Sequence, residues 1–208
     1  GGGKSLIRVS DDGFGMTADE LALALERHAT SKLPDDDLSG IRTMGFRGEA
    51  LPSIASIARF SLTSRARGAA EAFVIAIDGG GQPQLRPAAL KAGTEAEVRD
   101  IFFATPARLK FLKTDRSETA EALDVVRRLA LANPAVGFSF VSEERRWLDC
   151  PPGEDRAARV ARIMDASFME NAVPVAREGE DVVIEGFAGL PTAARAQATA
   201  TQAAIDAA

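Results

Sequence analysis

The stretch Leu6–Gly15, which reads Leu-Ile-Arg-Val-Ser-Asp-Asp-Gly-Phe-Gly, decides the fold. Its first part alternates apolar and polar residues and then meets Asp11-Asp12-Gly13, which predicts a strand that runs into a tight loop. A carboxylate at a strand end can accept a hydrogen bond from an exocyclic amine such as that of adenine, and nearby glycines let the backbone approach a flat ring. By itself, however, an Asp-Gly-x-Gly stretch is more often a plain turn.

A helix and a long loop are expected directly after this stretch. Thr17 and Glu20 form a capping-box pattern and apolar residues follow at helical spacing, so we expect a helix that ends near Ala29. Residues 30–48 lose this periodicity, which predicts a long loop, and a short helix is expected at 49–56. Both ends of the loop offer groups for anionic oxygens: hydroxyl and ammonium groups at 30–32, and glycine-freed N–H groups at 45–51, where the helix begins.

The rest of the chain predicts a hairpin-rich sheet and further helices. Strands are expected at residues 60–64, 72–77, 93–101, 136–142, 146–150 and 182–187, and helices at 106–113, 118–132 and 157–164. The Pro151-Pro152-Gly153 interruption predicts a domain boundary. We therefore expect a first domain at 1–152, the start of a second at 153–192, and an Ala-rich tail at 193–208 that supports no core packing.

Composition excludes several classes of protein. The 208 residues are 46% hydrophobic and 26% charged, as in ordinary globular proteins, and no apolar run approaches the roughly 18 residues of a membrane span. The single cysteine, Cys150, can form no internal disulfide, so a reducing compartment such as the cytoplasm is expected. The net charge of -5 gives no bulk attraction to nucleic acid, and any such contact would need a local basic patch.

Two features have competing interpretations. Gly3-Lys4-Ser5 resembles the end of a phosphate-binding P-loop, but a strand pattern follows where that mechanism needs a helix, so we reject this interpretation. Basic residues gather at 99–116, 127–128 and 145–146. A solvated helix face explains most of them, and a DNA-binding groove is the alternative.

Four segments, in this order and spacing, resemble the MutL family of DNA mismatch repair ATPases, which belongs to the GHKL superfamily. They are Asp11–Met16, Arg27–Lys32, Gly45–Leu51 and, after Gly93-Thr94, Phe102–Leu112. Gyrase-type topoisomerases, related chaperones and sensor histidine kinases share the Asp-x-Gly-x-Gly element but not the Gly-Phe-Arg-Gly-Glu-Ala-Leu segment. The resemblance covers about residues 4–192, with Ala104 standing where many relatives carry Asn.

The resemblance implies an α/β fold: a GHKL (Bergerat-type) α/β sandwich with a mixed sheet covered by helices on one face, followed by the start of a second small α/β domain. It also implies ATP and Mg²⁺ as cofactors. The residues that it assigns to the nucleotide are Asp11, Gly13, Gly15, Thr30, Ser31, Lys32, Gly45, Phe46, Arg47, Gly48, Glu49, Ala50, Leu51 and Thr94. Among these, Asp11 would bind the adenine amino group and Thr94 would close the adenine side.

The family's catalytic Glu and Mg²⁺-binding Asn are expected upstream of residue 1, and its γ-phosphate Lys after residue 208. No catalytic residue and no metal ligand is therefore expected within these 208 residues, and the chain alone is expected to hydrolyse ATP poorly or not at all, because general-base activation and metal clamping each accelerate phosphoryl transfer by about 100-fold or more.

The resemblance implies a matchmaker in DNA mismatch repair, whose ATP-driven homodimerisation couples mismatch recognition by its partner MutS to downstream repair. It implies weak DNA binding, for which Arg108 and Lys110 are candidate contacts, no membrane partner, and a cytoplasmic location at the bacterial nucleoid. The alternative is a non-enzymatic interaction module that keeps the fold, and nothing within the sequence separates the two.

Overall fold

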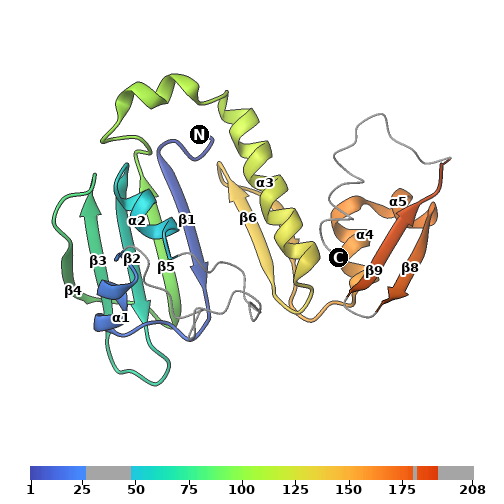
Figure 1. Cartoon of the computed structure of the whole chain (residues 1–208), viewed down its shortest axis with the longest axis horizontal. Coiled ribbons are helices and arrows are strands. Elements are labelled where there is room, and N and C mark those ends of the chain that lie inside the picture. Colours follow the sequence, from blue (N-terminus) through green and yellow to red (C-terminus); the bar gives the residue numbers. More distant parts are fainter. Residues whose placement is uncertain (27–47, 180–181, 192–208) are drawn as a thin grey trace. The chain divides into compact units, whose positions relative to one another are not determined.

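A computed structural model of the chain describes residues 1–26, 48–179 and 182–191 (Figure 1). The chain divides into two compact units, Gly1–Asp115 and Arg116–Ala208. Most of the predicted loop at 30–48 and the Ala-rich tail predicted at 193–208 lie outside the described residues.

The first unit is built on a five-stranded sheet in the order β1-β5-β2-β3-β4. Its strands are β1 (Leu6–Asp11), β2 (Arg59–Arg65), β3 (Ala72–Asp78), β4 (Gln84–Ala88) and β5 (Gly93–Arg99). The α/β architecture is confirmed, but the sequence predicts a mixed sheet, whereas all four strand pairs described here are antiparallel. The reason is connectivity: β2, β3 and β4 follow one another as hairpins, and β5 returns between β1 and β2.

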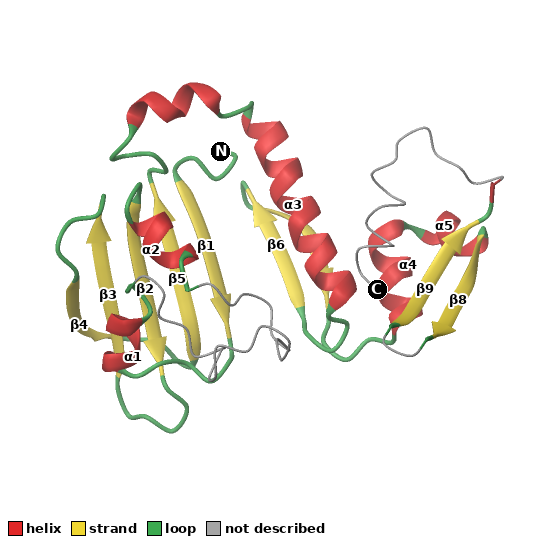
Figure 2. Ribbon diagram, in the orientation of Figure 1, coloured by secondary structure: helices red, strands yellow, loops and turns green. Residues whose placement is uncertain are grey.

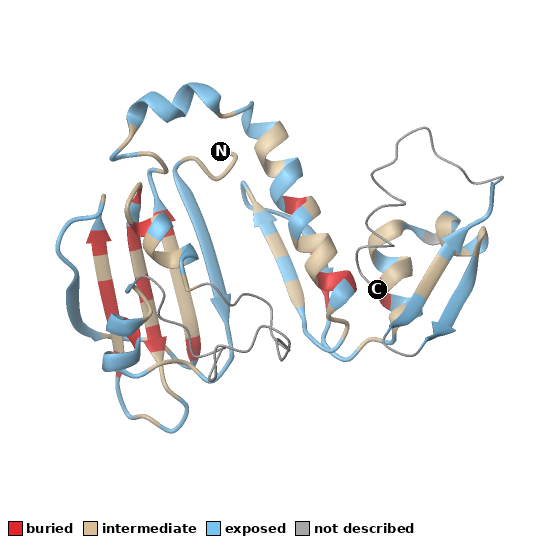
Figure 3. Ribbon diagram, in the orientation of Figure 1, coloured by how far each residue is buried: buried red, intermediate tan, exposed pale blue. Residues whose placement is uncertain are grey.

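Helices α1 (Ala18–Leu23) and α2 (Ala50–Ala55) pack on one face of this sheet (Figure 2). Alternate residues of β2 are buried, as expected for a strand with one covered face. The buried side chains concentrate on the central strands (Figure 3). The core consists of Leu21, Ala55, Ala58, Phe60, Leu62, Ile75, Ile77 and Val98.

Helix α1 begins as predicted and ends earlier. Thr17 Oγ1 accepts a hydrogen bond from Glu20 N at 3.3 Å, and Glu20 Oε2 accepts one from Thr17 N at 2.7 Å, so the capping box is present. The predicted extension towards Ala29 is wrong, because the helix ends at Leu23. The next two N–H groups, at residues 25 and 26, bond three residues back instead of four, which tightens the last turn.

The described residues of the second unit form two separate hairpins and three helices. Its elements are α3 (Asp115–Ala132, which starts at the last residue of the first unit), β6 (Phe138–Ser142), β7 (Arg145–Cys150), α4 (Arg156–Met164), α5 (Ala166–Glu170), β8 (Ala172–Glu178) and β9 (Val183–Gly189). Leu123 and Ala130 of α3 pack with Leu148 and Cys150 of β7, and Ile163 of α4 packs against the same cluster.

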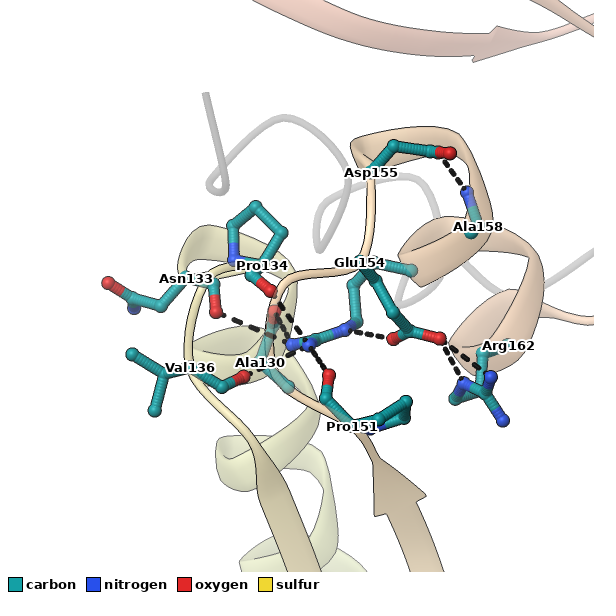
Figure 4. Close-up of polar contacts among 10 residues, drawn as sticks. Ala130, Asn133, Pro134, Val136, Pro151, Glu154, Asp155, Ala158 and Arg162 are labelled. Carbon is teal, nitrogen blue, oxygen red and sulfur yellow. Dashed lines mark hydrogen bonds and ion pairs between the residues drawn. The ribbon is translucent and has the colours of Figure 1, made fainter. Parts of the chain in front are cut away.

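The guanidinium of Arg159, fully buried in α4, joins this helix to the end of α3. It donates hydrogen bonds of 2.7–3.4 Å to the carbonyl oxygens of Ala130, Asn133, Pro134, Val136 and Pro151, and it pairs with Glu154 at 2.7 Å (Figure 4). The boundary expected after residue 152 thus falls inside the second unit of the structure. The division into domains at 1–152 and 153–192 stays a prediction.

In the part of the chain that the structure describes, no helix combines the length and the hydropathy that crossing a membrane requires.

Candidate functional site

Asp11 and Thr94 lie opposite each other at one end of the five-stranded sheet, as the last pair of the β1–β5 ladder. Asp11 Oδ1 accepts hydrogen bonds from the backbone N–H groups of Gly13, at 2.9 Å, and Thr94, at 3.3 Å. Both bonds use the same carboxylate oxygen and Asp11 is exposed, so with respect to residues 1–26, 48–179 and 182–191 Oδ2 is available to a further donor.

Side chains on the face of the sheet opposite to the Asp11 side chain hold β1 against β5 and so help to place Asp11. Arg8 pairs with Glu97 at 2.6 Å, and the Ser10 hydroxyl donates to Glu95 at 2.9 Å. Burial raises the pKa of the Glu97 carboxyl, but hydrogen bonds from Arg99 and Arg8 outweigh it and leave this pKa below its ordinary value. Glu97 therefore stays ionised at neutral pH and keeps both arginines in place.

Glycines let three backbone segments meet at the Asp11 end of the sheet. Gly15 has a φ of +66°, and a Cβ there would lie 1.9 Å from the carbonyl oxygen of Arg65. Gly93 has a φ of +74°, and a Cβ there would lie 2.0 Å from the carbonyl oxygen of Asp11. Neither position can carry a side chain without a backbone shift, so glycine is a steric requirement of this junction.

Ser64, a residue that sequence reasoning missed, sits at the centre of the same junction and is fully buried. Its Oγ accepts a hydrogen bond from Met16 N at 2.8 Å and lies 3.0 Å from the carbonyl oxygen of Gly93 and 2.9 Å from Thr94 Oγ1. A signal for it exists in the sequence: Ser64 is a polar residue in the register that Phe60 and Leu62 define as buried.

Arg67, which follows β2, also holds the loop that carries the site glycines. The backbone N–H of Arg67 donates to the carbonyl oxygen of Phe14 at 2.7 Å, and the Arg67 guanidinium lies 4.2 Å from the centroid of the exposed Phe14 ring. The glycine loop is thus tied to the segment after β2 as well as to Ser64 of β2.

The residues expected at the phosphates are only partly described. Gly48 has a φ of +61°, Glu49 is the N-cap of α2 without a side-chain capping bond, and Ala50 and Leu51 open the helix. The remaining six residues assigned to the nucleotide lie outside the described part of the chain: Thr30, Ser31, Lys32, Gly45, Phe46 and Arg47. The structure therefore brings together Asp11, Gly13, Gly15 and Thr94.

Arg108 and Lys110, the candidate DNA contacts, lie on the short 3₁₀ helix η2 (Pro106–Phe111), where a longer helix is predicted. Both are exposed, and Lys110 Nζ lies 5.1 Å from the centroid of the Phe111 ring. Several other basic residues are already paired with carboxylates, as Arg128 is with Asp124 at 3.0 Å.

The described residues offer no metal centre of the usual composition. Within 1–26, 48–179 and 182–191, no three or more His, Cys, Asp or Glu side chains gather closely enough to hold an ion.

Solved structures share this fold. The MutL ATPase domain of Aquifex aeolicus complexed with ADP matches with a TM-score of 0.68 and 29% identity, over 88% of this chain and 64% of that chain. The N-terminal domain of a DNA repair protein, at 22% identity, a TM-score of 0.70, and coverage of 89% of this chain and 59% of that chain, shares the fold alone. The fold is therefore that of the GHKL-type ATPase domain of MutL proteins.

Curated MutL sequences make the relationship specific, although no protein-family model matches the chain. The DNA mismatch repair protein MutL of Azorhizobium caulinodans is 56% identical over 200 residues, which are 94% of this chain and 32% of that protein. MutL of Rhodopseudomonas palustris strain BisB5 is 52% identical over 202 residues, 95% of this chain and 34% of that protein. Over the region that it spans, about a third of these relatives' length, the chain is a member of the MutL family, as its sequence motifs predict.

Proposed function

We propose that this chain forms the ATP-binding part of a MutL-type DNA mismatch repair ATPase. The observation that carries the proposal is the Asp11–Thr94 pair, which holds a carboxylate and a hydroxyl side by side at the ends of adjacent strands. The similar Aquifex aeolicus domain was solved with ADP, which supports an adenine nucleotide as the ligand.

In this proposal the free carboxylate oxygen of Asp11 accepts a hydrogen bond from the adenine amino group. Gly13 and Gly15 let the loop backbone approach the ring, and Thr94 lies beside the amino group. Backbone N–H groups at 48–51 donate to the phosphates, together with residues 30–32 and 45–47 of the predicted loop. ATP would bring Mg²⁺, and no step here runs through the metal.

For the whole protein we propose ATP hydrolysis and nucleotide-driven homodimerisation that couples mismatch recognition by MutS to downstream repair, in the cytoplasm at the nucleoid. Membership of the MutL family supports this role. The chain spans about a third of its curated relatives, so these activities are assigned to the whole protein.

We also propose that Arg108 and Lys110 contact DNA phosphates weakly. Both side chains are exposed on η2, and neither forms an ion pair with another residue in the described ranges. Their charge is therefore free for an external anion, in contrast to that of Arg128.

The test is the Asp11→Asn variant in a titration with a non-hydrolysable ATP analogue. Asparagine keeps an oxygen for the N–H groups of Gly13 and Thr94 but turns the ligand-facing oxygen into an N–H₂ donor, which opposes the adenine amine. We expect affinity to fall by about 100-fold or more, because in the complex the new N–H₂ donor would face the N–H₂ donor of the base. The matched control is Asp12→Asn, on the neighbouring exposed residue, which should bind like the wild type.

Equal affinities of the Asp11→Asn variant and the wild type would refute the proposed base contact. A wild-type chain that binds no adenine nucleotide at all would favour the non-enzymatic interaction module instead.

A further inference from the structure

The hydroxyl of Ser64 touches three parts of the candidate base site. It contacts the backbone N–H of Met16 after the glycine loop, the carbonyl oxygen of Gly93 and the hydroxyl of Thr94, at 2.8, 3.0 and 2.9 Å. Ser64 is fully buried, so water does not compete for these bonds. A serine hydroxyl has one proton to donate and two lone pairs, and all three are used here.

The directions of these bonds follow from counting protons. The carbonyl oxygen of Gly93 carries no hydrogen, so Ser64 must donate to it, and the N–H of Met16 must donate to Ser64. The only proton of Ser64 is then committed. The contact between Ser64 Oγ and Thr94 Oγ1 must therefore use the proton of Thr94.

This arrangement leaves Thr94 Oγ1 with lone pairs only towards a ligand. Asp11, paired with Thr94 across the strands, also presents acceptors, the oxygens of its carboxylate. Two acceptors side by side suit a ligand with N–H bonds at that point and oppose one with a carbonyl oxygen.

We propose that Ser64 is a positioning residue that sets the direction of the Thr94 hydroxyl and thereby selects a 6-amino purine over a 6-oxo purine. The inference rests on the proposed function, since it concerns the base of the nucleotide assigned to Asp11. With Ser64 in place, a 6-oxo base meets two acceptors. Without it, the Thr94 hydroxyl can rotate and donate to that oxygen.

The experiment compares the dissociation constants of ADP and IDP, whose bases differ at ring position 6, for the full 208-residue chain by calorimetric titration. We expect the wild type to prefer ADP by about 100-fold and Ser64→Ala to prefer it by only about tenfold, because the Asp11 carboxylate still discriminates. Ser61→Ala is the matched control. It makes the same substitution on β2, but on the opposite face of the strand from Ser64, so it should keep the wild-type ratio of ADP and IDP affinities.

Ser64→Ala also orphans the N–H of Met16 and can reduce folding, so a second variant carries the test. Thr94→Val removes the hydroxyl itself and should lower the ADP preference as Ser64→Ala does. The double variant should lower this preference no further, since both changes remove the same hydrogen bond between Ser64 and Thr94. An ADP preference that stays at the wild-type value in folded Ser64→Ala or in Thr94→Val overturns the inference.

The failure of the inference is distinguishable from that of the proposed function. If the wild type binds ADP, Asp11→Asn abolishes binding and Ser64→Ala leaves the ratio unchanged, only the role of Ser64 is refuted. If the wild type binds neither ADP nor IDP, the assigned nucleotide site itself is refuted, and the inference with it.

Discussion

Replacing Arg159 by Met should unfold the second unit at a markedly lower denaturant concentration. The guanidinium is fully buried and donates to five carbonyl oxygens, those around the end of α3 and the exit of β7 (Figure 4). Methionine fills most of the same aliphatic volume, so the substitution creates little cavity. The expected loss of stability therefore comes from the missing hydrogen-bond donors.

The size of the effect follows from what remains after the change. A hydrogen bond from a charged donor contributes about 1.5–3 kcal/mol, but these five share one group. Val136 and Pro151 are exposed, so water can reach some of the released carbonyl oxygens, and Glu154 keeps Arg162 as a partner at 2.7 Å. We therefore expect a loss of about 3–5 kcal/mol, as for removing one partner of a buried ion pair.

Urea unfolding followed by tryptophan fluorescence measures this loss. Trp147, the only tryptophan of the chain, lies in β7 under the guanidinium of Arg145, at 4.1 Å from its ring centroid, and reports on the second unit. The midpoint should fall by roughly 2 M, given a slope of about 1–3 kcal/mol per M. The control is Arg162→Met, which removes an exposed partner of the same Glu154 and should lower the midpoint far less, because solvent screens an exposed ion pair. Equal midpoints for the two variants would refute the reasoning.

Two further predictions concern acid stability and DNA. Hydrogen bonds from Arg162 and Arg159 hold the pKa of Glu154 below its ordinary value, so the stability it contributes is present above the ordinary pKa of about 4.3 and is lost as pH falls through the lowered folded pKa. Urea midpoints measured from about pH 6 to pH 3 should therefore fall more steeply for the wild type than for Glu154→Gln, and parallel curves would contradict this. In the complete protein, the Arg108→Ala/Lys110→Ala variant should make the plot of log affinity against log salt shallower by about 1.8, from about 0.9 per phosphate contact. A double alanine variant of Arg145 and Arg146, which are engaged by Trp147 and Asp149, should leave that slope unchanged, and an unchanged slope for the first variant would count against DNA contact.

Signals that act over a few residues predicted local structure well. The Thr17 and Glu20 pair predicted the start of α1, because a capping box forms within one turn. The apolar pattern around Phe60 and Leu62 predicted a strand at 60–64, and β2 occupies residues 59–65. The family motifs predicted the α/β class in the same way, from residues that are close in sequence.

Two strands escaped prediction because each contains a proline. Pro87 lies in β4 and Pro174 in β8, and a proline within an apolar run normally argues against a strand. Both strands have an open edge: β4 is the last strand of its sheet, and β8 pairs only with β9 among the described residues. A strand with an open edge tolerates a residue without an N–H, and the position of a strand in its sheet depends on sheet order, which the local pattern does not contain.

The contact between Asp11 and Thr94 at the candidate site also depends on the order of the strands. Asp11 and Thr94 are 83 residues apart, and only the return of β5 to the side of β1 joins them. Apart from the family resemblance, no pattern in the sequence pairs these two residues. The order of strands, and not the propensity of any one strand, creates the site.

Ser64 and Arg159, the polar residues that the described part of the chain buries completely, show where such junctions can be found in a sequence. Ser64 follows Leu62 in the buried register of β2, and Arg159 precedes Ile163 by one helical turn on the packed face of α4. A polar group in an apolar register is costly unless it is fully hydrogen-bonded, so such a residue marks a place where distant backbone groups converge.

Most partners of these two residues are backbone atoms, which the fold positions whatever their own side chains are. Each junction therefore depends on the identity of one side chain, the hydroxyl of Ser64 or the guanidinium of Arg159, and much less on the side chains of its partners. It follows that changing the exposed side chain of Val136, whose carbonyl oxygen accepts from Arg159, should leave that junction intact, whereas changing Arg159 should not.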